Sequence, residues 1–304
     1  MFDGIIGLDA MKGALTAAAD NGRVNHCYIF IGAALSGKKT MALAFAKGLL
    51  GCDSKNHADI QLLSPQKDSY GVEQVREELL SLVQMKPLMA ARRVFIITRA
   101  DTMTTAAQNA VLKALEDAPK HCMFILTARS NSFLQTILSR AIVMHLPPLT
   151  AAQVEGYLLD SGVSHKRAAI SAAYAKGAIG RALQIAVDDE FFVKRDFVID
   201  AMMQSRRLSY VEAFDIAKKM ADDKDNLQQY LEFFNYILRD ILVYKHGGQV
   251  WQRDILDVMH SFNIDEAMAL SIFKAIESAR QYLKQNTTPL LTMEVLMLRI
   301  LGAV

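Results

Sequence analysis

Several features that mark common protein classes are missing from this 304-residue chain. It has only three cysteines, which are odd in number and far apart: Cys27, Cys52 and Cys122. They offer neither a disulfide framework nor a four-ligand zinc site, and they fit a reducing compartment. The formal net charge is only +2. No overall field therefore draws the chain onto nucleic acid, and any DNA contact must be local or supplied by partners.

Long apolar runs are also missing. No run approaches the roughly 18 apolar residues needed to cross a membrane. The opening MFDGIIG lacks the basic region and long apolar stretch of a signal peptide. A hydrophobic content of 52% with 22% charged residues is typical of a folded chain. We therefore expect a soluble cytoplasmic protein of two or three domains with no membrane partner.

Apolar β-rich runs alternate with helical patterns up to about residue 147. We predict strands at 26–32, 58–63, 92–98, 121–128 and 141–146, and helices at 38–50, 72–85, 105–118 and 132–140. This alternation is typical of a doubly wound parallel sheet. Pro147 and Pro148 then interrupt the pattern, and only helical periodicity follows, with an amphipathic stretch at 228–244 and a last helical stretch at 289–301.

The most informative motif is GAALSGKK at residues 32–39, between a predicted strand and a predicted helix. A phosphate-binding loop reads G-x-x-x-x-G-K-[ST], where the glycines admit the phosphates, the lysine neutralises them and the hydroxyl holds Mg²⁺. Gly32, Gly37 and Lys38 fit this pattern. Lys39 stands at the hydroxyl position, and Thr40 comes one residue late. The alternative is an ordinary turn between a buried strand and a helix.

The partner strand of such a loop has also lost its acidic residues. Hydrolysis needs one carboxylate for the metal and another to polarise water at the end of a second strand. The apolar strand at 92–98 ends instead in Thr98 and Arg99, with Asp101 beyond them. A threonine is a poor Mg²⁺ ligand and an arginine cannot act as a base. We therefore expect no ATP hydrolysis by this chain.

Several segments in register resemble a known family. They are FDGIIGLDAMKGAL at the start, the NGRVNH stretch before the first strand, TTAAQNAVLKALEDAP, TILSRA and GAIGRALQIA. Together they resemble the AAA+ clamp-loader family, and within it the delta-prime branch of bacterial DNA polymerase III. The resemblance covers about residues 1–190, and the remaining third matches weakly.

The resemblance implies an α/β fold with three domains. These are an AAA+ P-loop-type parallel sheet domain at 1–148 with a degenerate nucleotide site, a small helical lid domain at 149–190 and an all-α collar domain at 191–304. It also implies a non-hydrolysing subunit of a complex that uses ATP to load the sliding clamp onto primed DNA. Its partners would be the gamma/tau motor subunits and the delta subunit, with clamp and primer-template DNA reached through the complex. Most delta-prime subunits carry a four-cysteine zinc module, which is reduced in this chain to residues 51–59 with Cys52 alone, so we expect no zinc.

Arg140 is the leading functional candidate. The resemblance implies that it acts as an arginine finger, in trans, on the nucleotide of a neighbouring subunit. The alternative is an arginine that only complements a helix dipole. Arg181 matches the position from which AAA+ small domains reach back to the nucleotide. Whether the loop of Gly32, Gly37 and Lys38 still binds ATP or ADP stays open, since Lys39 and Thr40 break the motif; a vestigial loop is the leading interpretation, and no cofactor is required.

Other polar residues carry weaker signals. Thr127 and Ser130–Asn131 stand where this family senses the γ-phosphate, although a strand-end cap explains them equally well. His26 fits a packed or hydrogen-bonded residue better than a catalytic one. Glu116 and Asp117 end a helix and are interpreted as a solvated terminus.

Two rival functions remain. One is an active gamma/tau-type ATPase, against which Lys39, Thr98 and Arg99 argue. The other is an AAA+ adaptor outside replication, against which the NAVLKALEDAP and SRA motifs argue.

Overall fold

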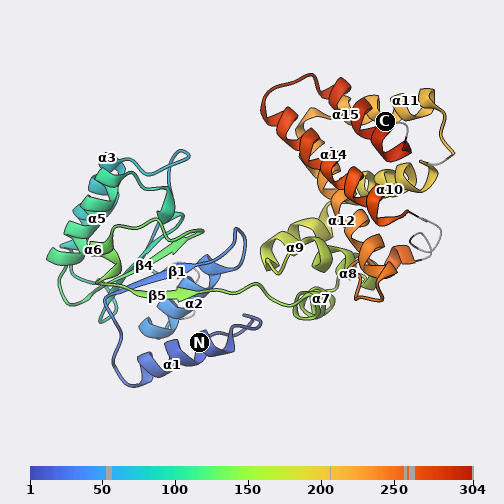
Figure 1. The fold of residues 1–304 in the computed structure, drawn as a ribbon. Helices are drawn as coiled ribbons and strands as arrows, with labels where there is room; N and C mark the ends of the chain where they lie inside the picture. Colours follow the sequence, from blue (N-terminus) through green and yellow to red (C-terminus); the bar gives the residue numbers. More distant parts are fainter. Residues whose placement is uncertain (53–56, 206, 257–258, 260–263, 303–304) are drawn as a thin grey trace. The chain divides into compact units, whose positions relative to one another are not determined.

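The computed structural model describes residues 1–52, 57–205, 207–256, 259 and 264–302. Contacts divide the chain into two compact units (Figure 1). The first, which we call the sheet unit, comprises Met1–Gly162 and Ala175–Leu183. The second, the helical unit, comprises Val163–Tyr174 and Gln184–Val304. The three domains expected from the sequence stay a prediction.

Helices and strands alternate along the chain as far as β5, and the described elements after it are helical. In chain order they are α1 (Asp9–Asp20), β1 (Cys27–Ile31), α2 (Lys38–Leu50), β2 (Ile60–Leu63), α3 (Val72–Val75), a π-helical turn (Arg76–Leu80), α4 (Ser81–Val83), β3 (Arg93–Ile97), a 3₁₀ turn (Ala100–Thr102), α5 (Thr105–Asp117), β4 (Cys122–Ala128), α6 (Gln135–Leu138), β5 (Ile142–His145), α7 (Ala151–Asp160), α8 (His165–Tyr174), α9 (Ile179–Val187), α10 (Asp189–Gln204), α11 (Tyr210–Asp222), a 3₁₀ turn (Lys224–Asn226), α12 (Leu227–Lys245), a 3₁₀ turn (Arg253–Ile255), α14 (Glu266–Lys284) and α15 (Pro289–Leu301).

The sheet has the strand order β2-β3-β4-β1-β5, and all neighbouring strands are parallel. The five predicted strands are confirmed, each within two residues of its expected bounds. The central strands β1, β3 and β4 are buried along their whole length, because helices cover both faces. This is the parallel α/β sheet that the sequence predicts.

Two hydrophobic cores lie on the two faces of the sheet. Alternate residues of a strand point to opposite faces. In β1, Ile29 packs into a core with residues of α3, α5 and α6. Its neighbour Phe30 packs into the other core, with residues of α1 and α2. Figure 1 shows these two sets of helices on either side of the sheet.

Two helices predicted in the sheet unit differ from the observed ones. The stretch predicted at 72–85 contains the π-helical turn between α3 and α4. The helix predicted at 132–140 is only the four residues of α6. The Gln108 side chain is the reason, because its amide donates to Ser132 O at 3.0 Å and its carbonyl accepts from Leu134 N at 2.9 Å. Those bonds hold the residues before α6 extended.

The helical unit contains a hydrophobic core and one buried polar cluster. The helical stretches predicted at 228–244 and 289–301 appear as α12 and α15. The Arg195 side chain is fully buried and pairs with Asp254 at 2.8 Å. Gln252 Oε1 accepts from Tyr174 Oη at 2.7 Å and from Arg195 Nε at 3.1 Å. These bonds fix the segment after α12 against α8 and α10.

No helix in the described parts of the chain is both long and apolar enough to span a bilayer.

Candidate functional site

The loop between β1 and α2 has the backbone of a phosphate-binding loop. Gly37 has a φ of 89°, a left-handed conformation that favours glycine, and it forms the N-cap of α2. A Cβ atom at Gly32 would lie 3.0 Å from the Leu146 carbonyl oxygen and 3.1 Å from Ser36 Oγ. The two glycines of the motif are therefore required by the loop itself, and strand, loop and helix follow in the predicted order.

Lys38 is folded back onto its own loop. Its ammonium donates to Gly32 O at 2.8 Å and to Ala33 O, and it lies 3.4 Å from Ser36 Oγ. Burial lowers the pKa of Lys38, and Arg129 lowers it further, whereas Asp101 acts in the opposite direction. The lysine of the motif thus braces the loop in this structure.

A cavity of about 400 Å³ opens beside this loop. Four cationic side chains line it, from Lys38, Lys39, Arg99 and Arg129. Asp101 is the one carboxylate in its lining among the residues that the structure describes. The predicted loop residues and the end of β3 therefore do meet at one place, which carries an excess of positive charge.

The residues at this place do not fit Mg²⁺. That ion takes oxygen ligands, usually one or two carboxylates together with substrate phosphates. The Thr98 hydroxyl is already engaged, with Ser64 Oγ at 2.9 Å and with Leu63 O at 3.1 Å. Arg99 adopts a left-handed conformation, and its guanidinium donates to Asp68 O at 2.9 Å. Asp101 Oδ1 is buried with no hydrogen-bond partner in the described chain, but one carboxylate among four cations is no magnesium site.

Of the other candidates near the cavity, some line it and some do not. Thr127 lies inside β4 rather than after it, is buried and lines the cavity; Ser130 and Asn131 do not line it. Gly180 lines it too, and its N–H donates to Leu35 O at 2.9 Å. A Cβ atom at Gly180 would lie 2.9 Å from that oxygen. Arg181, the next residue, is not in the lining, so its nucleotide-facing role stays a prediction.

Arg140 follows α6 and precedes β5. Its Nη1 donates to Thr136 O at 3.0 Å and to Ser139 Oγ at 3.4 Å. Its Nη2 lies 3.0 Å from Glu116 Oε1, and the Arg140 side chain is 39% exposed. The helix-end contact that the sequence leaves as an alternative is therefore present, together with an ion pair that the sequence does not predict.

Glu116, which the sequence places in a solvated helix end, has a partner in the structure. It lies in the last turn of α5 and pairs with Arg140, and both Glu116 and Asp117 beside it are exposed, as predicted for a helix end in solvent. One signal in the sequence points to such a pair. An acidic residue at a helix C-terminus is opposed by the helix dipole, so a cation is expected near it.

Arg140 and the phosphate loop lie at opposite edges of the sheet. The loop follows β1 and so lies at the carboxyl-end edge, whereas Arg140 precedes β5 and Glu116 precedes β4. Because these strands are parallel, Arg140 and Glu116 both lie at the amino-end edge. His26, directly before β1, also lies there beside a shallow cavity that Lys120 and Cys122 help to line, and it is exposed rather than packed as the sequence leads us to expect.

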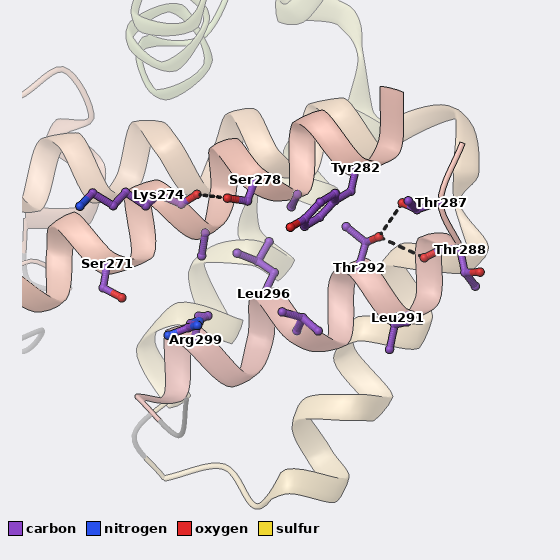
Figure 2. Close-up of a pocket in the computed structure, with 13 residues that line it drawn as sticks. Ser271, Lys274, Ser278, Tyr282, Thr287, Thr288, Leu291, Thr292, Leu296 and Arg299 are labelled. Carbon is purple, nitrogen blue, oxygen red and sulfur yellow. Dashed lines mark hydrogen bonds between the residues drawn. The ribbon is translucent and has the colours of Figure 1, made fainter. Parts of the chain in front are cut away.

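A second cavity, of about 520 Å³, lies between α14 and α15 of the helical unit (Figure 2). Two of its hydroxyl groups are bonded within their own helices: Ser278 Oγ donates to Lys274 O at 2.9 Å, and Thr292 Oγ1 donates to Thr288 O at 3.1 Å. Leu291 and Val295 in its wall are 61% and 46% exposed. This apolar groove lacks the paired acids and bases that a catalytic site needs.

Comparison with known proteins agrees with the family that the motifs resemble. Residues 8–150 match the family described as DNA polymerase III, delta subunit. The DNA polymerase III subunit delta' of Bacillus subtilis is 27% identical over 248 residues, which cover 75% of this chain and 74% of that protein. The Replication factor C small subunit 1 of Pyrobaculum islandicum is 29% identical over 227 residues, which cover 71% of this chain and 68% of that protein.

A solved structure agrees with the fold. The DNA polymerase III gamma subunit-related protein of Thermotoga maritima has a TM-score of 0.52 and 15% identity, with 94% of this chain and 98% of that chain covered. At this identity the likeness shows the fold alone, a parallel sheet followed by C-terminal helices. The match over residues 8–150 and the delta' relative both agree with the delta-prime clamp-loader family of DNA polymerase III subunits, which is the family that the motifs resemble.

Proposed function

We propose that this chain is a non-hydrolysing, architectural subunit of the DNA polymerase III clamp loader and that it supplies Arg140 to the ATP site of a neighbouring motor subunit. The neighbours are gamma/tau-type motor subunits and the delta subunit. The complex loads the sliding clamp onto primed DNA in the cytoplasm, and this chain reaches clamp and DNA through the complex.

The observation that carries the proposal is a contrast between the two edges of the sheet, since the cations at one edge exclude magnesium and the arginine at the other edge is partly exposed. At the phosphate loop, Lys39 stands where magnesium needs a hydroxyl, and Arg99 stands where it needs a carboxylate. Arg140, at the other edge, is partly exposed and held by contacts within its own chain. An arginine finger acts when it neutralises charge on a γ-phosphate across an interface.

The same charges argue against the gamma/tau-type alternative. A motor subunit must hold Mg²⁺ and orient water in its own site, and the Thr98 hydroxyl is already bonded to Ser64 Oγ and Leu63 O.

In the helical unit, the exposed Leu291 and Val295 support packing of this part of the chain against neighbouring subunits in a collar.

Reconstitution with motor and delta subunits, sliding clamp and primed DNA tests the proposal. Arg140→Ala should leave assembly intact and lower ATP turnover at the facing site by about 10²-fold or more, since arginine fingers contribute about 10³- to 10⁵-fold. Total ATPase should fall in part and clamp loading further. Arg140→Lys should restore little, because an ammonium cannot reproduce the planar fork.

Arg76→Ala is the matched control. Arg76 is an exposed arginine of the same unit that also pairs with a glutamate, Glu73. It should leave assembly, ATPase and loading unchanged. If the Arg140→Ala complex assembles and loads clamps at the wild-type rate, Arg140 is only a helix-end charge and the proposal is wrong.

A further inference from the structure

The Arg140 guanidinium is held on two sides by groups from two separate helices. Thr136 O and Ser139 Oγ of the α6 segment accept hydrogen bonds from Nη1. Glu116 Oε1, from the last turn of α5, lies 3.0 Å from Nη2. Contacts on two of its nitrogens fix the orientation of a planar group, whereas contacts on Nη1 alone leave it able to rotate about that bond.

The contacts leave one edge of the guanidinium open. A guanidinium has five N–H donors in a rigid fork. Within the described chain the contacts of Arg140 are hydrogen bonds from Nη1 and an ion pair of Nη2 with Glu116, and none is made by Nε. Nε–H and the adjacent N–H of Nη2 form the edge of the guanidinium whose spacing suits two phosphate oxygens at once.

We propose that Glu116 is the positioning residue of Arg140 and turns the Nε–Nη2 edge of the guanidinium toward the phosphate of a neighbouring subunit. This inference rests on the proposed function, because it gives Glu116 a role only if Arg140 acts in trans. Glu116 touches no phosphate itself. It acts through Arg140 alone.

Stability does not account for the pair. Both side chains are partly exposed, Arg140 by 39% and Glu116 by 45%. Ion pairs between exposed side chains contribute little to folding, since water screens them and ordering the side chains costs entropy. Glu116 also lies at a helix C-terminus, where the dipole disfavours a negative charge. If only folding mattered at this position, a lysine or an arginine would be favoured over a glutamate.

Substitutions of Glu116 in the reconstituted complex test the inference. A finger displaced by about 1 Å can lose about 10²-fold in rate. We expect Glu116→Ala to lower kcat for ATP at the facing site by about 10-fold, with KM for ATP unchanged, because the arginine acts as the γ-phosphate departs. Glu116→Gln keeps an acceptor oxygen and should lower kcat by only about 2- to 3-fold.

Two further variants separate positioning from simple damage. Asp117→Asn removes the neighbouring exposed carboxylate and should change neither rate nor assembly. The double variant Glu116→Ala with Arg140→Ala should be no slower than Arg140→Ala alone, because residues that act as one unit are not additive.

The outcomes distinguish the inference from the proposed function. If Arg140→Ala is slow while Glu116→Ala works at the wild-type rate, or if the two losses multiply in the double variant, the positioning role is wrong and the finger stands. If Arg140→Ala itself works at the wild-type rate, the finger is wrong and the positioning role falls with it. If Glu116→Ala lowers kcat and the double variant is no slower than Arg140→Ala, the result supports both the finger role of Arg140 and the positioning role of Glu116.

Discussion

The carboxyl-end and amino-end edges of one sheet carry two functional candidates, the phosphate loop and Arg140, in very different surroundings. At the carboxyl-end edge, Lys38 is bonded to its own loop and a single carboxylate, Asp101, lies among four cations in the described lining of the cavity. At the amino-end edge, Arg140 is anchored by three polar groups and stays partly exposed. The first arrangement opposes Mg²⁺, and the second presents a cation.

If Arg140 acts in trans as proposed, the two parts of an ATP site need not be kept together in one chain. When an ATP site is completed by an arginine from the next subunit, a subunit can lose its own site and still serve its neighbour's. The sheet is common to both edges, so a subunit of this kind must keep its fold even where its own pocket has no chemistry left to do. Substitutions at the two edges test that contrast, beginning with the largest expected effect.

The largest expected effect is the difference between one substitution at each edge. In the reconstituted complex, Arg140→Ala should reduce ATP turnover at the facing site by about 10²-fold or more, whereas Lys38→Ala should change turnover by less than about 2-fold. The reason is that Lys38 is hydrogen-bonded to Gly32 O and Ala33 O of its own loop, and on the proposed function it takes part in no reaction. Steady-state ATPase and clamp loading measure both variants side by side.

This comparison has an internal check. Lys38→Ala removes hydrogen bonds within the loop, so thermal unfolding of the isolated variant shows how much its fold is weakened. If Lys38→Ala assembles normally and yet abolishes clamp loading, the carboxyl-end pocket takes part in function and the contrast between the edges breaks down.

The second prediction concerns a buried carboxylate that supports the sheet common to both edges. Asp59 accepts three backbone hydrogen bonds, from Leu88 at 2.7 Å, Met89 at 2.8 Å and Ala90 at 2.9 Å. Asp59→Asn leaves one acceptor oxygen for these donors and should destabilise the chain by about 2–3 kcal/mol. Urea unfolding at neutral pH measures the loss, with the exposed Asp117→Asn as control.

The loss of stability in Asp59→Asn should depend on pH in a defined way. Burial alone would raise the pKa of Asp59, but the three N–H donors outweigh it and hold the pKa below its usual value. A group whose pKa is lowered on folding adds stability above its unfolded pKa of about 3.9, and that stability disappears as pH falls through the folded value. The gap between wild type and Asp59→Asn should therefore be full at pH 7 and shrink in acid. An equal gap at pH 3 and pH 7 would contradict this account.

Much of the sheet unit could be predicted from the sequence, because its signals are local. Apolar runs bounded by turn residues identified the five strands, and the loop motif gave the bounds of α2 as 38–50, as observed. The residues that meet at the pocket could be identified as well. Lys39, Thr98 and Arg99 stand at positions whose chemistry is fixed by spacing from the glycines and from the strand end.

What the sequence could not supply are contacts between segments that lie far apart along the chain. The Gln108 side chain shortens α6 by bonding to Ser132 and Leu134 from another helix. Glu116 likewise reaches Arg140 only because α5 and α6 end at the same edge of the sheet. Helical periodicity does not predict such bonds, because they depend on how the helices are packed together.

The third prediction is that the isolated chain does not hydrolyse ATP. The metal side of its pocket has an engaged threonine hydroxyl and an arginine bonded to a backbone carbonyl. Phosphate release by the purified chain with Mg²⁺ should therefore stay at background. Turnover near 1 per second, the low end of typical enzyme rates, would show that this edge is active and would remove the contrast on which the proposed function depends.

The smallest expected effect is that of a metal chelator, which should not change the unfolding temperature of the chain at all. Structural zinc is held by about four ligands, and cysteine binds it as the thiolate. Burial raises the pKa of Cys27 to about 12 and raises the pKa of Cys122, so both stay protonated at neutral pH. Cys52 and His57 are then too few for a site, and no group of metal ligands occurs in the part of the chain that the structure describes. Thermal unfolding with and without EDTA, together with zinc analysis of the purified chain, measures this. Stoichiometric zinc and a lower unfolding temperature in EDTA would mean that the chain retains a metal module in some other form, and that its fold depends on more than the two cores of the sheet unit and the core of the helical unit.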